Sequence, residues 1–160
     1  MYATLEQYVM YYGEIAADDF NRFLIEAQRY MDILTTGIDN VRKLKVAFPT
    51  EDAENIAYCA CHIVNILKQI SDAEASAASA RGYTEGANGL QGKVVSSVSA
   101  GNESVSYGTA SGELSAIDKA IADPEEKKKL IERIVKLWLS GVTDANGVNL
   151  LYMGRYPKNV

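Results

Sequence analysis

Hydrophobic residues recur at spacings of three and four over two long stretches in the first half of the chain, the pattern of amphipathic helices. One stretch covers residues 18–35 and the other residues 51–73. A shorter helix is predicted over residues 4–12, with Thr4 as its cap and Gly13 as its end. We expect the 51–73 helix to be central, because its apolar residues are the most numerous: Ile56, Cys59, Ala60, Ile63, Ile66, Leu67 and Ile70.

Residues 38–48 are ambiguous between a short helix and a loop that leads to Pro49. Their apolar positions have roughly helical spacing, and Arg42, Lys43 and Lys45 are expected to face outward. The hydrophobic pattern therefore predicts a connection here without deciding its conformation.

Helical spacing returns in the last third of the chain. A short helix within residues 111–122 opens at Ser111 or Ser115. A longer one begins at Asp123, which can cap it, with Pro124 in the first turn and Glu126 placed to complete a capping box. The side chains expected to face inward are Leu130, Ile131, Ile134, Val135, Leu137 and Trp138.

Between these two helical parts the composition changes. Residues 73–92 are mostly Ala, Ser and Gly, which indicates a helix end that fades into a flexible linker. Residues 93–99 and 103–107 then alternate β-branched with small polar residues, and Ala100-Gly101-Asn102 between them has turn chemistry. This pattern predicts a β-hairpin.

The expected fold is mainly α: a bundle of about five helices with a β-hairpin in a flexible Ser-Gly-rich insertion before the last helices. A length of 160 residues favours one domain. Its parts are N-terminal helices (1–72), linker and hairpin (73–110), C-terminal helices (111–141) and a tail (142–160). The tail contains an apolar run: Leu150, Leu151, Tyr152 and Met153.

A net charge of −5 and a pI near 4.9 argue against tight binding of nucleic-acid phosphates. Ten tyrosines against three phenylalanines and one tryptophan suit half-buried and interface positions. The chain has no apolar run of 18 residues and no signal-peptide pattern at its beginning, so we expect no membrane association and synthesis in the cytoplasm.

Few residues are arranged for reaction chemistry. Cys59 and Cys61 point about 200° apart on a helix, so they cannot share a metal ion or form a disulfide, and buried reduced thiols are expected. Neither Ser104 nor Ser106 has the flanking glycines of a nucleophile elbow, and no P-loop occurs. For the single histidine, His62, a core or interface role is favoured over a general base. We therefore expect no enzyme, cofactor or metal site.

Two short motifs resemble those of phage head–tail connector proteins, a family that includes adaptor, head-completion and DNA-packaging proteins. They are Gly101-Asn-Glu-Ser-Val-Ser-Tyr107 and Val148-Asn-Leu-Leu-Tyr-Met-Gly154. The order of helices, Ser-Gly-rich segment and tail is also similar, so the resemblance spans most of the chain. Residues 143–146 depart from the family pattern as an extra segment before the tail motif.

The resemblance implies a structural protein of the virion, located at the head–tail junction after synthesis in the host cytoplasm. Such proteins form a homo-oligomeric ring of roughly twelve-fold symmetry beneath the portal protein, in some cases only when they dock on it. The ring extends the DNA channel and offers a platform for a neck or tail completion protein. DNA passes through without sequence-specific binding, which suits an acidic chain.

A ring needs two different faces of each subunit to meet, and two segments are candidates for that role. One is the hairpin, where Val105 and Tyr107 form the packing face; the other is the tail, through Leu150, Leu151, Tyr152 and Met153. Two alternatives stay open. One is a cytoplasmic α-helical regulatory or protein-binding module that binds through the tyrosine-rich first helix, and the other is a small hydrolase that uses His62.

Overall fold

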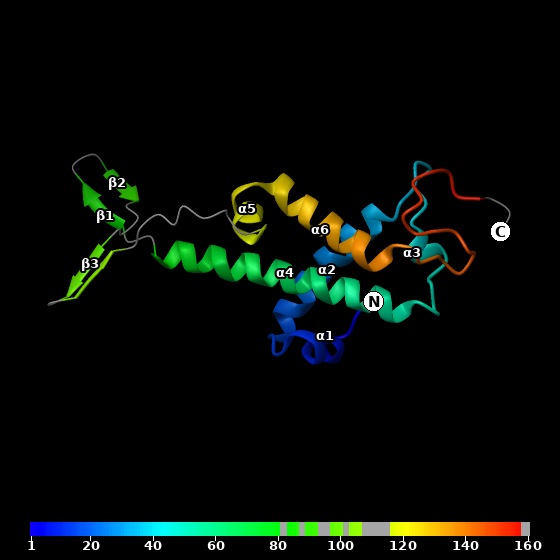
Figure 1. Cartoon of the computed structure of the whole chain (residues 1–160), viewed down its shortest axis with the longest axis horizontal. Coiled ribbons are helices and arrows are strands. Elements are labelled where there is room, and N and C mark those ends of the chain that lie inside the picture. The colour runs from blue at the N-terminus through cyan, green and yellow to red at the C-terminus, as the bar shows by residue number, and fades with distance from the viewer. Residues whose placement is uncertain (81–82, 87–88, 93–96, 101–102, 107–115, 158–160) are drawn as a thin grey trace.

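A computed structural model describes residues 1–80, 83–86, 89–92, 97–100, 103–106 and 116–157, with the backbone alone for residues 76–80, the four strands and Asp118. The fold is mainly helical, as predicted. Six helices lie in the described residues (Figure 1): α1 Leu5–Tyr12, α2 Ala17–Leu34, α3 Lys43–Val46, α4 Ala53–Ala80, α5 Ala116–Ala122 and α6 Pro124–Leu139.

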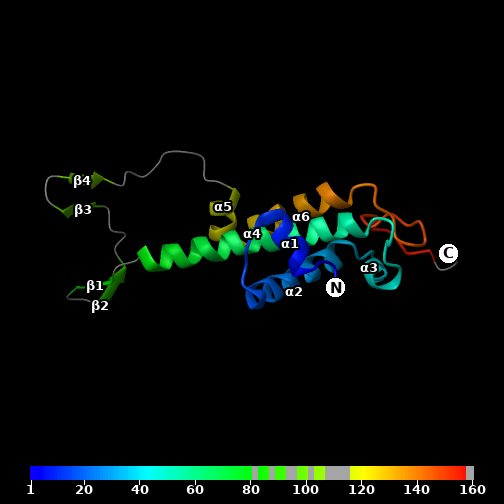
Figure 2. The same cartoon turned by 90° about the horizontal axis from the view of Figure 1, so that it is seen from below.

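Helix α4 is the axis of the molecule, and α1, α2, α5 and α6 all contact it (Figures 1 and 2). Its 28 residues span about 42 Å at the usual helical rise. The predicted apolar set of α4 lies in the core, where Ile56, Cys59 and Ile63 are fully buried. The prediction that this helix is central is confirmed.

Helix α1 begins and ends as its sequence predicts. The Thr4 hydroxyl accepts a hydrogen bond from the Gln7 amide at 3.2 Å, and the Gln7 side chain accepts one from the Thr4 amide at 2.9 Å. This reciprocal pair satisfies two amide groups that the first turn leaves without helical partners. Gly13 follows with a φ of 86°, a conformation that glycine adopts without steric cost.

Helix α6 follows its predicted start signal in part. The Asp123 carboxylate accepts a hydrogen bond from the Glu125 amide at 2.9 Å, with Pro124 in the first turn. Glu126 bonds to Lys129 at 2.6 Å, and the structure shows no capping box at this end. Leu137, expected inward, is exposed, because the buried stripe passes through Ile131, Ile134, Val135 and Leu139 and leaves Leu137 on the opposite side.

The insertion differs from its prediction in two ways. Helix α4 continues to Ala80 before two antiparallel hairpins, β1 Tyr83–Gly86 with β2 Gly89–Gly92 and β3 Ser97–Ala100 with β4 Glu103–Ser106. The second hairpin is the expected one, with Val98 opposite Val105. The first was missed because its strands contain Gly, Thr and Gln in place of alternating apolar residues. Both hairpins lie beyond the C-terminal end of α4 (Figures 1 and 2).

Candidate assembly surface

The tail folds back on itself after α6. Gly141 has a φ of 85°, and the Leu150 amide then donates to the Val142 carbonyl at 3.0 Å. The Asp144 carboxylate accepts hydrogen bonds from the amides of Asn146 and Val148, both at 2.9 Å. The extra segment before the tail motif therefore forms a turn, and Asp144 organises it in the way that Asp commonly does.

The end of the described tail is tied to the same aspartate. The Tyr156 hydroxyl donates to Asp144 at 2.6 Å, and burial together with this bond raises the pKa of Tyr156. The Tyr156 amide donates to Asp39 at 2.6 Å, which lowers the pKa of that carboxyl. The tail is thus bound at two points to residues outside its own apolar run.

A third attachment comes from Lys43, which its place in the sequence pattern predicts to face outward. That expectation is wrong: Lys43 is fully buried at the first residue of α3. Its Nζ donates to the carbonyl oxygens of Asn149 at 3.1 Å, Leu150 at 2.9 Å and Tyr152. Three acceptors match the three donors of an ammonium group. Burial lowers the pKa of Lys43, and the nearby carboxylates of Asp144 and Asp39 partly offset this effect.

The predicted assembly residues of the tail separate into two pairs. Leu150 is fully buried in this chain's own core, and Leu151 packs against that core. Tyr152 and Met153 point out, with exposed fractions of 51% and 53%. Within the single chain, only the second pair is available to a neighbour.

The hairpin formed by β3 and β4, which contains Val105, lies at the other end of the molecule (Figure 2). Val105 is in β4, paired with Val98 of β3. Tyr107 lies outside the described residues. The structure therefore places the two predicted assembly segments at opposite ends of α4 and does not bring them together within one chain.

A further surface was not predicted as functional. Ile25 and Ile33, with exposed fractions of 70% and 56%, flank Arg29 on the outer side of α2. The three residues are four apart, so they form one ridge. A hollow of about 900 Å³ lies along the ridge, and Asn40, Arg42 and Lys45 are among its lining residues. Both isoleucines fall outside the apolar repeat that the sequence predicts for this helix, which consists of Phe20, Phe23, Leu24, Ala27, Tyr30, Met31 and Leu34.

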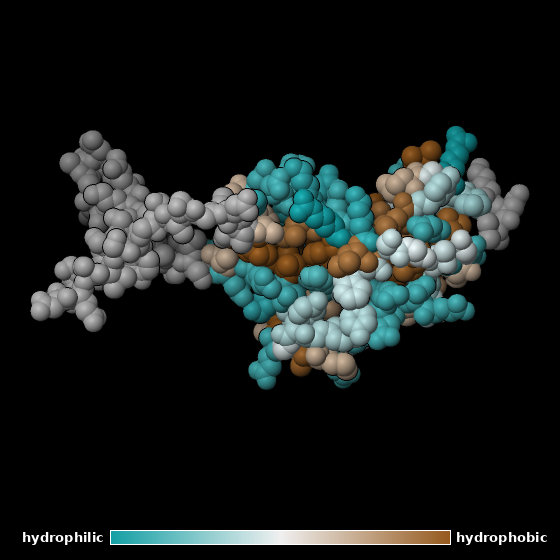
Figure 3. Space-filling view, in the orientation of Figure 1, coloured by the Kyte–Doolittle hydropathy of each residue, from teal (hydrophilic) through white to brown (hydrophobic). Residues whose placement is uncertain are grey.

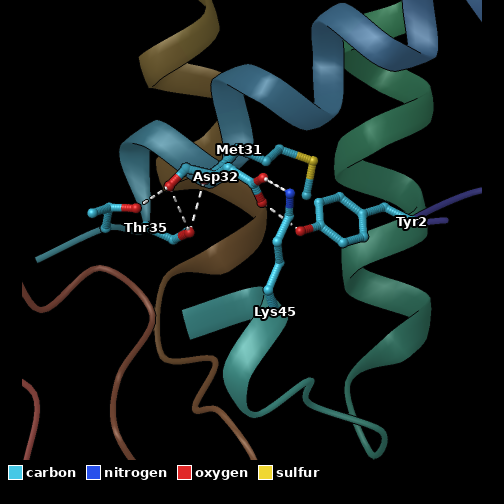
Figure 4. A network of polar contacts seen from close by, with 6 residues as sticks. Tyr2, Met31, Asp32, Thr35 and Lys45 are labelled. Carbon is cyan, nitrogen blue, oxygen red and sulfur yellow. Dashed lines mark hydrogen bonds and ion pairs between the residues drawn. The ribbon is translucent and has the colours of Figure 1, made fainter. Parts of the chain in front are cut away.

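At the edge of this hollow, Asp32 is bound from two sides (Figure 4). Lys45 of α3 lies 2.9 Å from the Asp32 carboxylate, and the Tyr2 hydroxyl donates to its other oxygen. Burial and the bond to Asp32 raise the pKa of Tyr2 well above its usual value. Asp32 therefore has a cationic partner in Lys45, whereas Arg29 and Arg42 have no ion-pair partner in the described part of the chain.

The side chains of His62, Cys59 and Cys61 have reactive potential, and each is engaged in packing or in a hydrogen bond. His62 accepts a hydrogen bond from the Trp138 indole at 3.0 Å, and burial lowers its pKa. Cys59 and Cys61 are buried and free, and burial raises the pKa of the Cys61 thiol to about 11. Within the described residues, no group of three or more His, Cys, Asp or Glu side chains could hold a metal ion.

Comparison of the chain with protein-family models, with curated proteins and with solved structures finds no match.

Among the helices in the described part of the chain, none combines the length and apolarity that a bilayer span needs. Hydrophobic surface is visible at the end of the molecule that carries the tail and in a strip between α4 and α6 (Figure 3).

Proposed function

We propose that the chain is a head–tail connector protein of a phage, which forms a ring beneath the portal protein and docks a neck or tail completion protein. The observation that supports this function most is the arrangement of the tail. Its backbone is held by Lys43 and Asp144, while the side chains of Tyr152 and Met153 stay exposed. Fixing the backbone in advance lowers the entropy lost when a partner binds these side chains.

The hairpins support the same function from the other end of the molecule. A two-stranded sheet has two edges whose backbone groups can pair with a strand of another chain. A subunit with one contact region at each end of a long helix suits a ring, in which each copy uses different faces toward its two neighbours. The net charge of −5 suits a channel through which DNA slides without binding.

The experiment combines the purified chain with the portal protein of the genome that encodes it. We expect rings on the portal in negative-stain electron microscopy and a matching shift in sedimentation velocity. The double variant Tyr152→Ser with Met153→Ser is expected to reduce ring formation at least about tenfold, because it removes the exposed apolar contacts. Its circular dichroism is expected to equal that of the original chain.

The matched control is Leu137→Ser, which removes an apolar side chain of α6 that is at least as exposed, 68%, and lies outside the tail motif. This control is expected to leave ring formation unchanged. A chain that gives no ring on the portal, at concentrations where it is folded, contradicts the proposed function.

The alternative is an α-helical module that binds a partner through α1 without forming a ring. In the structure Tyr8 is buried and Tyr11 stacks on Tyr58 with ring centroids 4.3 Å apart. The exposed apolar side chains of α1 are Val9, Met10 and Tyr12. This module would stay monomeric in the portal experiment, and Met10→Ser would weaken its partner binding.

A further inference from the structure

Helix α1 presents an acidic and apolar surface. Its exposed carboxylate is Glu6; Glu14 follows in the loop after Gly13, and α1 and this loop contain no Lys, Arg or His. Met10, with an exposed fraction of 76%, lies one helical turn from Glu6 on the same face. An unbranched, flexible methionine adapts its shape to an apolar hollow. This face therefore fits a surface that is apolar and positively charged.

The outer side of α2 has that opposite character. Its ridge carries Ile25 and Ile33 on either side of Arg29, and Arg42 lies across the 900 Å³ hollow. A second hollow of about 490 Å³ lies along the same ridge and is also lined by Arg29. Arg22 and Glu26 line it too, but they are paired with Asp19 and Lys127, so the cationic character of the ridge comes from Arg29 and Arg42. In a chain with a net charge of −5, this region is cationic and has exposed aliphatic side chains.

The α1 segment of the same chain cannot cover this ridge. Tyr8 packs on Phe20 with ring centroids 5.7 Å apart, and its hydroxyl donates to Asn65 of α4 at 3.3 Å. These contacts hold α1 against α4 with Met10 facing away from the core. The buried side of α2 faces α4, so its ridge also points outward. Each chain thus has two complementary faces that it leaves uncovered.

We propose that the outer face of α1 docks on the α2 ridge of a second copy of this chain. Met10 enters the hollow between Ile25 and Ile33, and Glu6 lies near Arg29. Because the two faces differ, the contact is heterologous and each copy can bind one neighbour on either side. The inference rests on the proposed function as a self-assembling connector and adds an α1–α2 contact between its subunits to the contacts of the tail and the hairpins.

Disulfide trapping tests this contact even when association is weak. Two single variants, Met10→Cys and Ile33→Cys, are mixed at equal concentration under mild oxidation, and the mixed dimer is quantified by non-reducing electrophoresis. The native thiols should not interfere, since Cys59 and Cys61 are buried. The control pair is Met10→Cys with Leu137→Cys, because Leu137 is at least as exposed as Ile33 but lies on α6.

We expect the first pair to yield at least about tenfold more mixed dimer than the control pair, because docking raises the effective concentration of the two thiols. Equal yields overturn the inference. The two proposals fail separately: rings on the portal without the preferential cross-link leave the connector function and remove this interface. A preferential cross-link without rings supports the interface and contradicts the connector function.

Charge reversal supplies a second, independent measurement. Glu6→Arg and Arg29→Glu are each expected to lower the cross-linking yield about tenfold, and their combination in one mixture is expected to recover it to within about threefold, because opposite charges face each other again. The control Lys136→Glu, on α6, changes the net charge by the same amount and sign as Arg29→Glu. If Arg29→Glu abolishes portal binding and leaves the self-cross-link unchanged, the ridge serves the portal and the inference is overturned.

Discussion

The C-terminal tail and the outer side of α2 both carry apolar residues beyond the main helical stripes, yet the structure treats them differently. In the tail, Leu150 is fully buried, whereas Ile25 and Ile33 of α2 remain exposed. The helix sets exposure by angular position alone, since its opposite side already faces α4. In the irregular tail, Lys43 and Asp144 bind backbone groups and so fix the path of the chain. That path decides which side chains of the tail are exposed.

The largest effect is expected from truncating the buried residue of the tail. Leu150→Ala should lower the free energy of unfolding by about 2–5 kcal/mol, because it removes packing contacts and leaves a cavity. Ile33→Ala, on the α2 ridge, should change it by less than about 0.5 kcal/mol. Urea denaturation of the two variants measures the contrast directly. Equal losses of unfolding free energy in the two variants would show that the burial of Leu150 does not contribute more to stability than the exposed Ile33.

The next effect concerns the lysine that holds the tail. Lys43→Met keeps the apolar stem but leaves three carbonyl oxygens without their donor, so we expect a loss of about 2–3 kcal/mol. Hydrogen exchange should speed up in the tail more than in α4. Lys128→Met, on an exposed position of α6, is the control and should be neutral. A neutral Lys43→Met would show that packing alone holds the tail.

A smaller loss is expected where the tail passes close to the loop after α2. A Cβ at position 37 would collide with the carbonyl oxygen of Gly154, which belongs to the backbone and cannot rotate away. Gly37→Ala should therefore cost about 1–3 kcal/mol, with faster exchange of the Tyr156 amide as the local signature. If that amide keeps its protection, the tail does not need this close approach.

The smallest effect is a pH dependence at His62 of α4, the helix against which α2 packs. The pKa of His62 is lowered by burial, so the unfolded chain takes up the proton first as the pH falls. Stability is therefore complete above the ordinary histidine pKa near 6.5 and declines below it. The proton would also compete with the indole of Trp138 for Nδ1.

Thermal unfolding followed by Trp138 fluorescence between pH 7.5 and 5.5 measures this effect, since the chain has one tryptophan and one histidine. The variant His62→Gln keeps an acceptor for the indole and does not titrate. We expect its melting temperature to depend less on pH over this interval. Identical pH profiles for the two proteins would assign the titration to other groups.

The candidate surfaces were predicted to different extents. The tail motif led to Tyr152 and Met153, which are exposed, but also to Leu150, whose burial depends on Lys43 from a distant segment. The α2 ridge was missed, although Ile25 and Ile33 fell outside the predicted stripe. An exposed isoleucine indicates a binding surface only when its spatial neighbours are known. Here the neighbours are the arginines of α2 and of the following loop, which line the same hollow.

The amino-acid sequence by itself determined the positions and buried faces of the main helices. Their period and caps are local properties. Helices α1 and α2 agree with the pattern, and α4 agrees except that it runs seven residues beyond its predicted end, to Ala80. Only the tertiary structure decided that Lys43 turns inward and that the tail divides between core and surface. The reason is physical: three carbonyl oxygens more than a hundred residues away satisfy the ammonium group, and no local pattern encodes a contact at that separation.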